Sequence, residues 1–165
     1  MARQSSQSPA TRFLDRHQVN YRIHEYHHEP GQRHFADEAV AALGHDPRRT
    51  FKTLIVRLTG GKQEYACAVV PVSRQLDLKA LAHIAGSKRA VMADPDVAER
   101  LTGMVVGGIS PVGQKRPIPQ FIDESALTFP TIFVSGGQRG LQVEIAPEVL
   151  IELAKANPAD LTRVS

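Results

Sequence analysis

The sequence predicts a single α+β domain, in which a curved, mixed and mostly antiparallel β-sheet forms a partial barrel flanked by helices. Apolar segments with strand character alternate with short amphipathic segments, and most neighbouring strands are separated by a tight turn or one short helix. The chain has 165 residues and no internal repeat or low-complexity linker, which suits one core. We expect residues 9–165 to form the domain and residues 1–8 to be a disordered tail.

The first quarter of the chain predicts a helix, a strand and a second helix. Residues 9–18 carry apolar side chains at helical spacing, and residues 19–28 alternate and are rich in tyrosine and isoleucine. A Glu-Pro-Gly step at 29–31 ends the strand. Residues 37–43 are helical in composition, and Gly44 is a typical C-terminal stop.

The strongest strand signals lie in the middle of the chain. Residues 51–58 and 64–72 are apolar, and residues 59–62 between them contain the paired glycines of a hairpin turn. A helix with Asp77 as its N-cap and Gly86 as its stop follows. The remaining predicted elements are a strand at 89–93, a helix at 95–101, strands at 118–123, 131–135 and 141–146, and a helix at 147–156.

Composition places the chain among folded globular proteins. Hydrophobic residues make up 42% and charged residues 22%, no apolar run approaches a membrane span, and the N-terminus lacks a secretory signal. The single cysteine, Cys67, excludes an internal disulfide and fits a reducing cytoplasm, where we expect a small apolar role for it. The net charge of +3 permits a polyanionic partner, but aromatic residues make up only 5%, which is few for stacking on single-stranded nucleic acid. We expect neither a membrane nor DNA as a partner.

The segment 102–116 combines four glycines with a Ser-Pro step and a terminal Lys-Arg pair. Apolar residues lead directly to Gly107 and Gly108, where the missing Cβ atoms let a ligand or another strand approach the backbone closely. The N–H groups of Gly108, Ile109 and Ser110 could then stabilise an oxyanion. A nucleophilic role for Ser110 is disfavoured because the pattern lacks the sharp elbow that such a serine requires. The alternative is an ordinary turn.

Lys52 is the single residue with the clearest chemical potential. Alternation places it on the same strand face as Leu54, Val56 and Leu58, so its ammonium group would point toward the interior end of a cleft. A buried cation requires an anionic partner or a wet pocket, and Lys52 could therefore anchor a phosphate or carboxylate. The alternative is a lysine at a strand end whose ammonium group reaches solvent.

Other polar clusters carry weaker signals. The histidine spacing fits no zinc ligand set, and we interpret these histidines as polar residues of an edge strand and its loop: His24, His27, His28 and His34. Asp37 and Glu38 are interpreted as helix N-terminal acids rather than an acid–base pair. We interpret the scattered basic residues mostly as solvated surface, although two of these groups flank glycine loops, where phosphates commonly approach: Arg74, Lys88-Arg89, Lys115-Arg116 and Arg139. We expect no metal and no cofactor.

Four motifs together resemble the YbaK/EbsC family in order and spacing. They are Phe-Lys-Thr-Leu at 51–54, Val-Pro-Val at 70–72 with Leu-Asp-Leu-Lys at 76–79, Gly-x-x-x-Gly-Gly-Ile-Ser-Pro-x-Gly-Gln at 103–114, and Val-Ser-Gly-Gly-x-Arg-Gly-Leu at 134–141. The resemblance extends from about residue 10 to residue 161. More distantly, the chain resembles the editing domain inserted in bacterial prolyl-tRNA synthetases.

The resemblance implies a YbaK-type α+β fold and a trans-editing enzyme that removes cysteine from mischarged Cys-tRNA(Pro). It implies that the acceptor end of tRNA(Pro) is the substrate, with prolyl-tRNA synthetase as a possible partner, and that the reaction needs no metal or protein nucleophile because the cysteine thiol attacks its own ester. The implied catalytic residues are Lys52, Gly107, Gly108 and Ile109, and the implied substrate-binding residues are Tyr26, Thr53, Ser110, Pro111 and Gln142.

Two departures from the family pattern concern the site. Ala36 replaces the glycine of a Phe-Gly-Asp-Glu motif, and Gln142 stands where close relatives can carry an aspartate. A glutamine would hold the substrate amine by a neutral hydrogen bond only. The glutamine bears on the strength and breadth of amino-acid recognition. Separately, two alternative functions stay open: a deacylase of another mischarged tRNA, such as Ala-tRNA(Pro), that uses water, and a non-catalytic module that binds tRNA or a synthetase. A cyclisation would class the enzyme formally as a lyase rather than a hydrolase.

Overall fold

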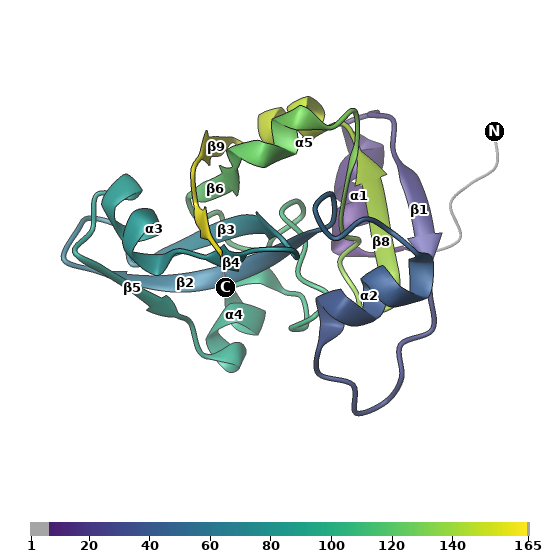
Figure 1. The fold of residues 1–165 in the computed structure, drawn as a ribbon, viewed down its shortest axis with the longest axis horizontal. Helices are drawn as coiled ribbons and strands as arrows, with labels where there is room; N and C mark the ends of the chain where they lie inside the picture. Colours follow the sequence, from purple (N-terminus) through teal and green to yellow (C-terminus); the bar gives the residue numbers. More distant parts are fainter. Residues whose placement is uncertain (1–6, 165) are drawn as a thin grey trace.

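The computed structural model describes residues 7–164, and Figure 1 shows short helices packed around curved sheets. The helices of this part of the chain are α1 (Pro9–Arg16), α2 (Phe35–Leu43), α3 (Leu78–Ile84), α4 (Pro95–Thr102), the 3₁₀ helix η1 (Glu124–Thr128) and α5 (Pro147–Ala154). The strands are β1 (Arg22–Glu25), β2 (Phe51–Thr59), β3 (Tyr65–Pro71), β4 (Gln75–Leu76), β5 (Arg89–Met92), β6 (Gln120–Asp123), β7 (Ile132–Ser135), β8 (Leu141–Ile145), β9 (Ala156–Ala159) and β10 (Thr162–Arg163).

The strands form one large sheet and two small ones. The large sheet has the order β5-β2-β3-β6-β9, the second has the order β1-β8-β7, and β10 pairs with β4. Within the large sheet β2 is antiparallel to β3 and β5, whereas β6 is parallel to both β3 and β9. The other pairings are antiparallel. The predicted α+β class and the mixed, mostly antiparallel sheet are therefore confirmed, and the sheets do not close into a barrel.

The β2–β3 hairpin determines where the molecule is open. β2 pairs with β3 from Phe51 to Arg57, but β5 pairs only with residues 56–59 of β2. On this β5 side the carbonyl oxygens of Ile55 and Thr59 accept hydrogen bonds from Ala93 and Lys88. Backbone groups of alternate residues point to the same side of an antiparallel strand, so the N–H and C=O of Thr53 face the open part of this edge.

Two hydrophobic clusters cover the two faces of the large sheet. One contains Phe51, Ile55 and Cys67 together with side chains of α1, α4 and the small β1-β8-β7 sheet. The other contains Val56 and Leu58 and is closed by α3 and by residues near the C-terminus. Because side chains alternate along β2, adjacent residues contribute to different clusters. Cys67 is fully buried, and this burial raises the pKa of its thiol to about 12, in agreement with the expected apolar role.

The two ends of the chain differ from the expected boundaries. Residues 1–6 of the expected tail lie outside the described residues, while Ser8 is buried, caps α1 and donates a hydrogen bond to the Gly136 carbonyl. Helix α5 ends at Ala154, before the predicted residue 156, because Lys155 adopts the left-handed conformation. The strands β9 and β10 then follow, and Pro158 is tolerated because β9 is the last strand of the sheet.

In the described part of the chain, no helix combines the length and the apolar character that crossing a membrane requires.

Candidate functional site

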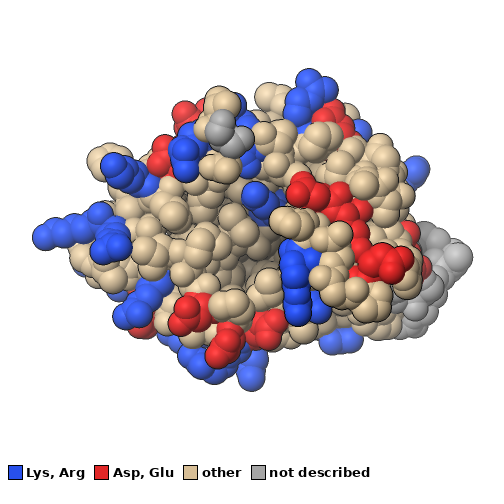
Figure 2. Space-filling view, turned by 60° about the horizontal axis from the view of Figure 1, so that its bottom comes forward, with Lys and Arg blue, Asp and Glu red and all other residues tan. Residues whose placement is uncertain are grey.

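A cavity of about 540 Å³ lies along the open edge of β2. Its walls come from the start of α2, the first half of β2, the segment between β3 and β4, the start of α4, residues 106, 107 and 109, and the start of β8. Figure 2 shows a hollowed face with mostly uncharged residues in its floor and both basic and acidic side chains around its edge. The cavity is lined by six of the predicted site residues: Tyr26, Lys52, Thr53, Gly107, Ile109 and Gln142. The other three, Gly108, Ser110 and Pro111, do not line it.

Lys52 and Thr53 present different chemistry because adjacent residues of a strand point to opposite faces. Thr53 shares the face of Phe51 and Ile55, which belong to the same cluster as Ile109. Lys52 shares the face of Leu54, which packs against the other cluster. The cavity therefore extends around the edge of the sheet. The Oγ1 atom of Thr53 is buried without a hydrogen-bond partner, and Lys52 forms no ion pair with any described residue.

The glycine loop, residues 103–113, turns sharply beside this edge. Gly107 has a φ of +88°, and a Cβ atom at this position would collide with the ring of Phe35. A Cβ atom at Gly108 would lie 2.7 Å from the backbone of Gln138. The two glycines therefore allow close contacts that a side chain would prevent, one with a cavity wall and one with the segment before β8.

The hydrogen-bond donors of the glycine loop differ from the expected set. The N–H of Gly108 donates to the Val105 carbonyl at 2.8 Å, and the N–H of Ser110 donates to the Met104 sulfur at 3.4 Å. Within the described part of the chain, the N–H groups of Gly107 and Ile109 have no partner. The expected row of Gly108, Ile109 and Ser110 is therefore corrected: among the cavity-lining residues of this loop, the N–H groups without a partner are those of Gly107 and Ile109.

Ser110 and Pro111 act as scaffold for this loop. Ser110 is 1% exposed, and its Oγ accepts from the N–H of Val112 at 3.3 Å. The carbonyl oxygens of Ser110 and Pro111 accept from the side-chain amides of Gln114 at 3.0 Å and Gln120 at 2.6 Å. These bonds hold the second half of the loop in place, and neither Ser110 nor Pro111 lines the cavity.

Phe35 forms a wall of the cavity to which sequence reasoning assigned no role. The Arg139 guanidinium lies 4.6 Å from the centre of the Phe35 ring, and its Nε donates to the Val106 carbonyl at 2.8 Å. On another side, His28 lies 5.7 Å from Phe35 between ring centres. A 2.7 Å hydrogen bond from His28 holds Glu38 and lowers the pKa of that carboxyl. The Phe-Ala-Asp-Glu motif was the signal that could have identified this wall.

Tyr26 contributes a hydroxyl group from the end of β1. Its N–H donates to the Gly140 carbonyl at 2.9 Å, and a Cβ atom on Gly140 would lie 2.8 Å from the Tyr26 carbonyl oxygen. Burial is the main cause that raises the pKa of the phenol above its usual value of 10.0. The hydroxyl therefore remains protonated at neutral pH and keeps its capacity to donate a hydrogen bond.

The side chain of Gln142 is oriented by a hydrogen bond with His45. Gln142 is 5% exposed, and its Oε1 lies 3.2 Å from Nδ1 of His45. Because an amide oxygen only accepts hydrogen bonds, the imidazole donates from Nδ1. The His45 ring stacks on Phe133 with 3.6 Å between ring centres, and burial lowers the pKa of His45, which keeps the imidazole neutral at pH 7. The interaction between residues 97 positions apart gives Gln142 a defined orientation.

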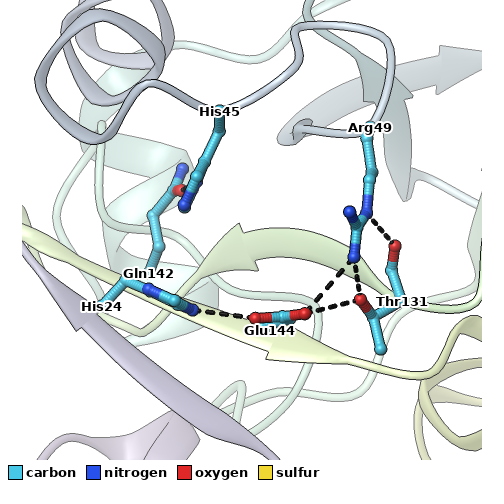
Figure 3. A network of polar contacts seen from close by, with 6 residues as sticks. All are labelled: His24, His45, Arg49, Thr131, Gln142 and Glu144. Carbon is cyan, nitrogen blue, oxygen red and sulfur yellow. Dashed lines mark hydrogen bonds and ion pairs between the residues drawn. The ribbon is translucent and has the colours of Figure 1, made fainter.

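Beside Gln142 lies a cluster of paired groups that we call the Glu144 cluster: His24, Arg49, Thr131 and Glu144 (Figure 3). Glu144 accepts from His24 at 2.9 Å and from Thr131 at 2.7 Å, and Arg49 approaches it to 3.3 Å. Burial raises the pKa of Glu144, but the hydrogen bonds from Thr131 and His24 outweigh this effect and the net shift is downward. His24 is therefore a partner of a carboxylate on the polar face of the β1-β8-β7 sheet.

The arrangement is suited to polarising a carbonyl and holding an anion. It offers two N–H groups, a phenol, a glutamine amide and an unpaired ammonium group around one cavity. Preorganised N–H donors stabilise negative charge that develops on a carbonyl oxygen, while an ammonium group attracts a phosphate or a developing alkoxide. A cavity of this volume is in the range that binds small organic molecules.

Comparisons with known proteins identify the family to which this chain belongs. Residues 30–153 match the family described as the aminoacyl-tRNA editing domain. A protein of Enterococcus faecalis, named as a proposed Cys-tRNA(Pro)/Cys-tRNA(Cys) deacylase, EbsC, is 37% identical over 98% of this chain and 98% of its own length. Among solved structures, a proposed trans-editing enzyme for prolyl tRNA synthetase superposes with a TM-score of 0.79 at 28% identity, covering 96% of this chain and 99% of that one. A scaffold from a computational epitope-grafting study superposes with a TM-score of 0.80 at 26% identity, covering 97% of this chain and 100% of that one.

Proposed function

Because this chain belongs to the aminoacyl-tRNA editing domain family, we propose that it is a trans-acting deacylase that removes cysteine from mischarged Cys-tRNA(Pro). The substrate is proposed from the names of the Enterococcus faecalis relative and of the proposed trans-editing enzyme, both similar over nearly their whole length. One observation carries the proposal: Lys52 and the unpartnered N–H groups of Gly107 and Ile109 line the same cavity.

We propose that the cysteine of the substrate supplies the nucleophile. Its thiol sulfur attacks the carbonyl carbon of its own ester, the carbon–oxygen bond to the ribose breaks, and the thiol proton passes to the departing ribose oxygen. The products are a free tRNA 3′ end and a cyclic thioester. An attack within one molecule avoids the entropic cost of bringing a second reactant to the site. The cyclisation would class the enzyme formally as a lyase.

Each cavity group then has a separate role in the proposal. The N–H groups of Gly107 and Ile109 stabilise the oxyanion. The ammonium group of Lys52 stabilises negative charge on the departing ribose oxygen. The hydroxyl of Tyr26 and the neutral amide of Gln142 orient the amino acid. The Oγ1 atom of Thr53, which has no partner in the protein, offers a further hydrogen bond to the substrate. Gly108, Ser110 and Pro111 keep the loop in shape.

A panel of tRNA(Pro) esters tests both the activity and its chemistry. We expect the purified protein to release cysteine, and to release serine at least about tenfold more slowly because a hydroxyl is a weaker nucleophile than a thiol. Alanine should be released more slowly still. Release of alanine at the rate of cysteine would overturn the thiol mechanism in favour of water. Failure to release any amino acid from tRNA(Pro) would overturn the proposed activity and leave a binding module.

The acceptor end of tRNA(Pro) is the proposed partner, and we propose that prolyl-tRNA synthetase assists its delivery. The net charge of +3 is modest for a protein that binds a polyanion without help. Co-sedimentation of the protein with the synthetase, with and without tRNA(Pro), tests this assistance. Assistance predicts a complex that forms in the presence of tRNA(Pro) and a higher deacylation rate when the synthetase is added. No complex and no change in rate would contradict it.

A further inference from the structure

Arg74 differs from the neighbouring arginines Arg48 and Arg49 because its guanidinium has no carboxylate partner among the described residues. Arg48 pairs with Asp46 at 2.9 Å, and Arg49 approaches Glu144 to 3.3 Å. The guanidinium of Arg74, which lines the cavity, donates only from Nε, to the Thr162 hydroxyl at 2.8 Å. Its two terminal nitrogens have no partner among residues 7–164. Four donor positions of a partly buried guanidinium are thus left for a molecule that enters the cavity.

The backbone around Arg74 is firmly placed. Its N–H donates to the Pro71 carbonyl at 3.2 Å, and the preceding residues Val72 and Ser73 donate to the carbonyls of Thr50 and Pro47 at 2.8 and 3.2 Å. The following strand, β4, pairs with β10, which supplies Thr162. The bond from Nε to Thr162 fixes one edge of the planar guanidinium group. The N–H donors of the two terminal nitrogens remain available for hydrogen bonds to a ligand. A planar fork held in this way is pre-organised for two parallel hydrogen bonds to one anion.

Arg74 and Lys52 make one side of the cavity cationic. Lys52 shares a strand face with Leu54, and Leu54 packs against the same cluster as Leu76, two positions after Arg74. Among the described residues that line the cavity, the only carboxylate is that of Asp37, so the two cations exceed the acids. The unpartnered N–H groups of Gly107 and Ile109 belong to the other side, where Ile109 lies in the opposite cluster. The cavity is therefore divided into a cationic side and a carbonyl-binding side.

We propose that the terminal nitrogens of Arg74 bind the phosphodiester group on the 5′ side of the substrate's terminal nucleotide. This inference rests on the proposed function. The carboxyl group of the amino acid is esterified in an aminoacyl-tRNA, so the anionic groups of the substrate are the phosphates of the RNA. The phosphodiester bound by Arg74 places the nucleic-acid chain toward β4 and β10. The ester carbonyl then lies toward Gly107 and Ile109. Arg74 thus determines the direction in which the substrate enters.

A pair of substrates with and without this phosphate tests the inference. One substrate is Cys-tRNA(Pro), and the other is cysteinyl-adenosine, which carries the same ester but no phosphate. For Arg74→Gln we expect kcat/KM on Cys-tRNA(Pro) to fall by about tenfold, mainly through KM, and kcat/KM on cysteinyl-adenosine to stay unchanged. Arg74→Lys should restore part of the loss because it keeps the charge without the fork. Arg12→Gln, at an exposed position of α1 away from the cavity lining, is the matched control and should match the wild type on both substrates.

The outcomes separate this inference from a structural role and from the proposed function. An equal loss on both substrates, or no loss on either, would overturn the role of Arg74. A wild-type protein that is inert on both substrates would instead overturn the proposed deacylation. In that case, binding of an uncharged RNA oligonucleotide ending in CCA still decides the matter. Loss of one phosphate contact in Arg74→Gln predicts weaker binding and a salt dependence reduced by about 0.7 in the slope of log K against log salt, whereas an unchanged slope would overturn the inference.

Discussion

The Glu144 cluster and the cavity both contain cationic groups, but these groups are paired with a carboxylate in the cluster and unpaired in the cavity. In the cluster, Arg49 and His24 both contact one carboxylate, which also accepts from Thr131 (Figure 3). In the cavity, Lys52 and Arg74 form no ion pair within the described part of the chain. Both side chains are partly buried, and an unpaired charge that is withdrawn from water is costly unless a ligand completes the pairing. The comparison separates charged groups that are paired within the fold from the cavity cations that we propose bind the substrate.

The largest effect that we expect from this comparison is the loss of catalytic activity in the Lys52→Ala variant. Removing the ammonium group should lower kcat/KM for Cys-tRNA(Pro) by about 10²–10³, the usual loss when one electrostatic stabiliser of the transition state is removed. The free energy of unfolding should change little because Lys52 has no partner in the folded protein. Deacylation kinetics and urea denaturation measure the two quantities. Lys62→Ala, on the exposed β2–β3 turn, is the control, and a Lys52→Ala enzyme as active as this control would remove Lys52 from the site.

Gly107→Ala should lower both stability and activity. Gly107 and Gly31 share a φ of +88°, a conformation that costs a non-glycine residue about 1–2 kcal/mol. At Gly31 nothing lies within 4 Å of an added Cβ, whereas at Gly107 the Cβ would collide with Phe35. Thermal unfolding and deacylation of the two alanine variants therefore separate backbone strain from displacement of the cavity wall. Equal losses in both variants would show that the Phe35 contact has no influence.

Glu144→Gln should act on stability rather than catalysis. The change leaves Arg49 and His24 without their carboxylate, and loss of one partner of such a partly buried set costs about 2 kcal/mol. Urea denaturation at pH 7 measures this loss. In the folded fraction, kcat should remain within about twofold of the wild type, since a structural residue affects the population of folded protein more than the chemical step. A large fall in kcat with unchanged stability would reverse the assignment of this cluster.

His45→Phe should have a smaller effect, on substrate binding. Phenylalanine retains the stacking on Phe133 but cannot donate the hydrogen bond that orients Gln142. One neutral hydrogen bond contributes about 1 kcal/mol, so we expect KM for Cys-tRNA(Pro) to rise about fivefold with little change in kcat. Steady-state kinetics measure this split. The double variant with Gln142→Ala should be no worse than Gln142→Ala alone, and additive losses would show that His45 acts independently of Gln142.

The smallest expected effect is a difference in acid stability. The hydrogen-bonded Glu144 has a pKa below its usual value of 4.5 in the folded protein. Its contribution is fully present above the pKa of the unfolded chain and is lost as the pH falls through the lower folded value. The difference in unfolding free energy between wild type and Glu144→Gln should therefore shrink as the pH falls from 5 to 3. Denaturation curves across this interval test it, and a constant difference would contradict the direction of the shift.

The sequence predicts most of the fold because its strongest elements depend on local patterns. The long apolar strands β2 and β3 and the helix caps at Asp77 and Gly44 carry their signals within a few residues. The strands β4, β9 and β10 do not, since β4 and β10 have two residues each and β9 contains a proline. Their pairings join residues that are distant in the chain, and no local pattern specifies them.

The candidate site was predictable in outline but not in its hydrogen bonds. The motifs identify the glycine loop and Lys52, and six of the predicted residues line the cavity. The direction of each N–H depends on a local turn to Val105 and on the sulfur of Met104, so the sequence could not show that Gly107 rather than Gly108 offers a donor. The contact between His45 and Gln142 is equally hidden, since it exists only after β8 and the segment after α2 come together.

The open edge of β2 also matters for the behaviour of the protein in concentrated solution. Unpaired strand edges invite neighbouring chains to extend the sheet, and proteins commonly protect them with short strands, charges or covering elements. Here Phe35 of α2 and Gly107 of the glycine loop stand beside the exposed part of the edge, and Lys52 places a charge on it. A strand that approached the backbone of Thr53 would meet these obstacles. Residues that line the cavity therefore also protect this strand edge against aggregation.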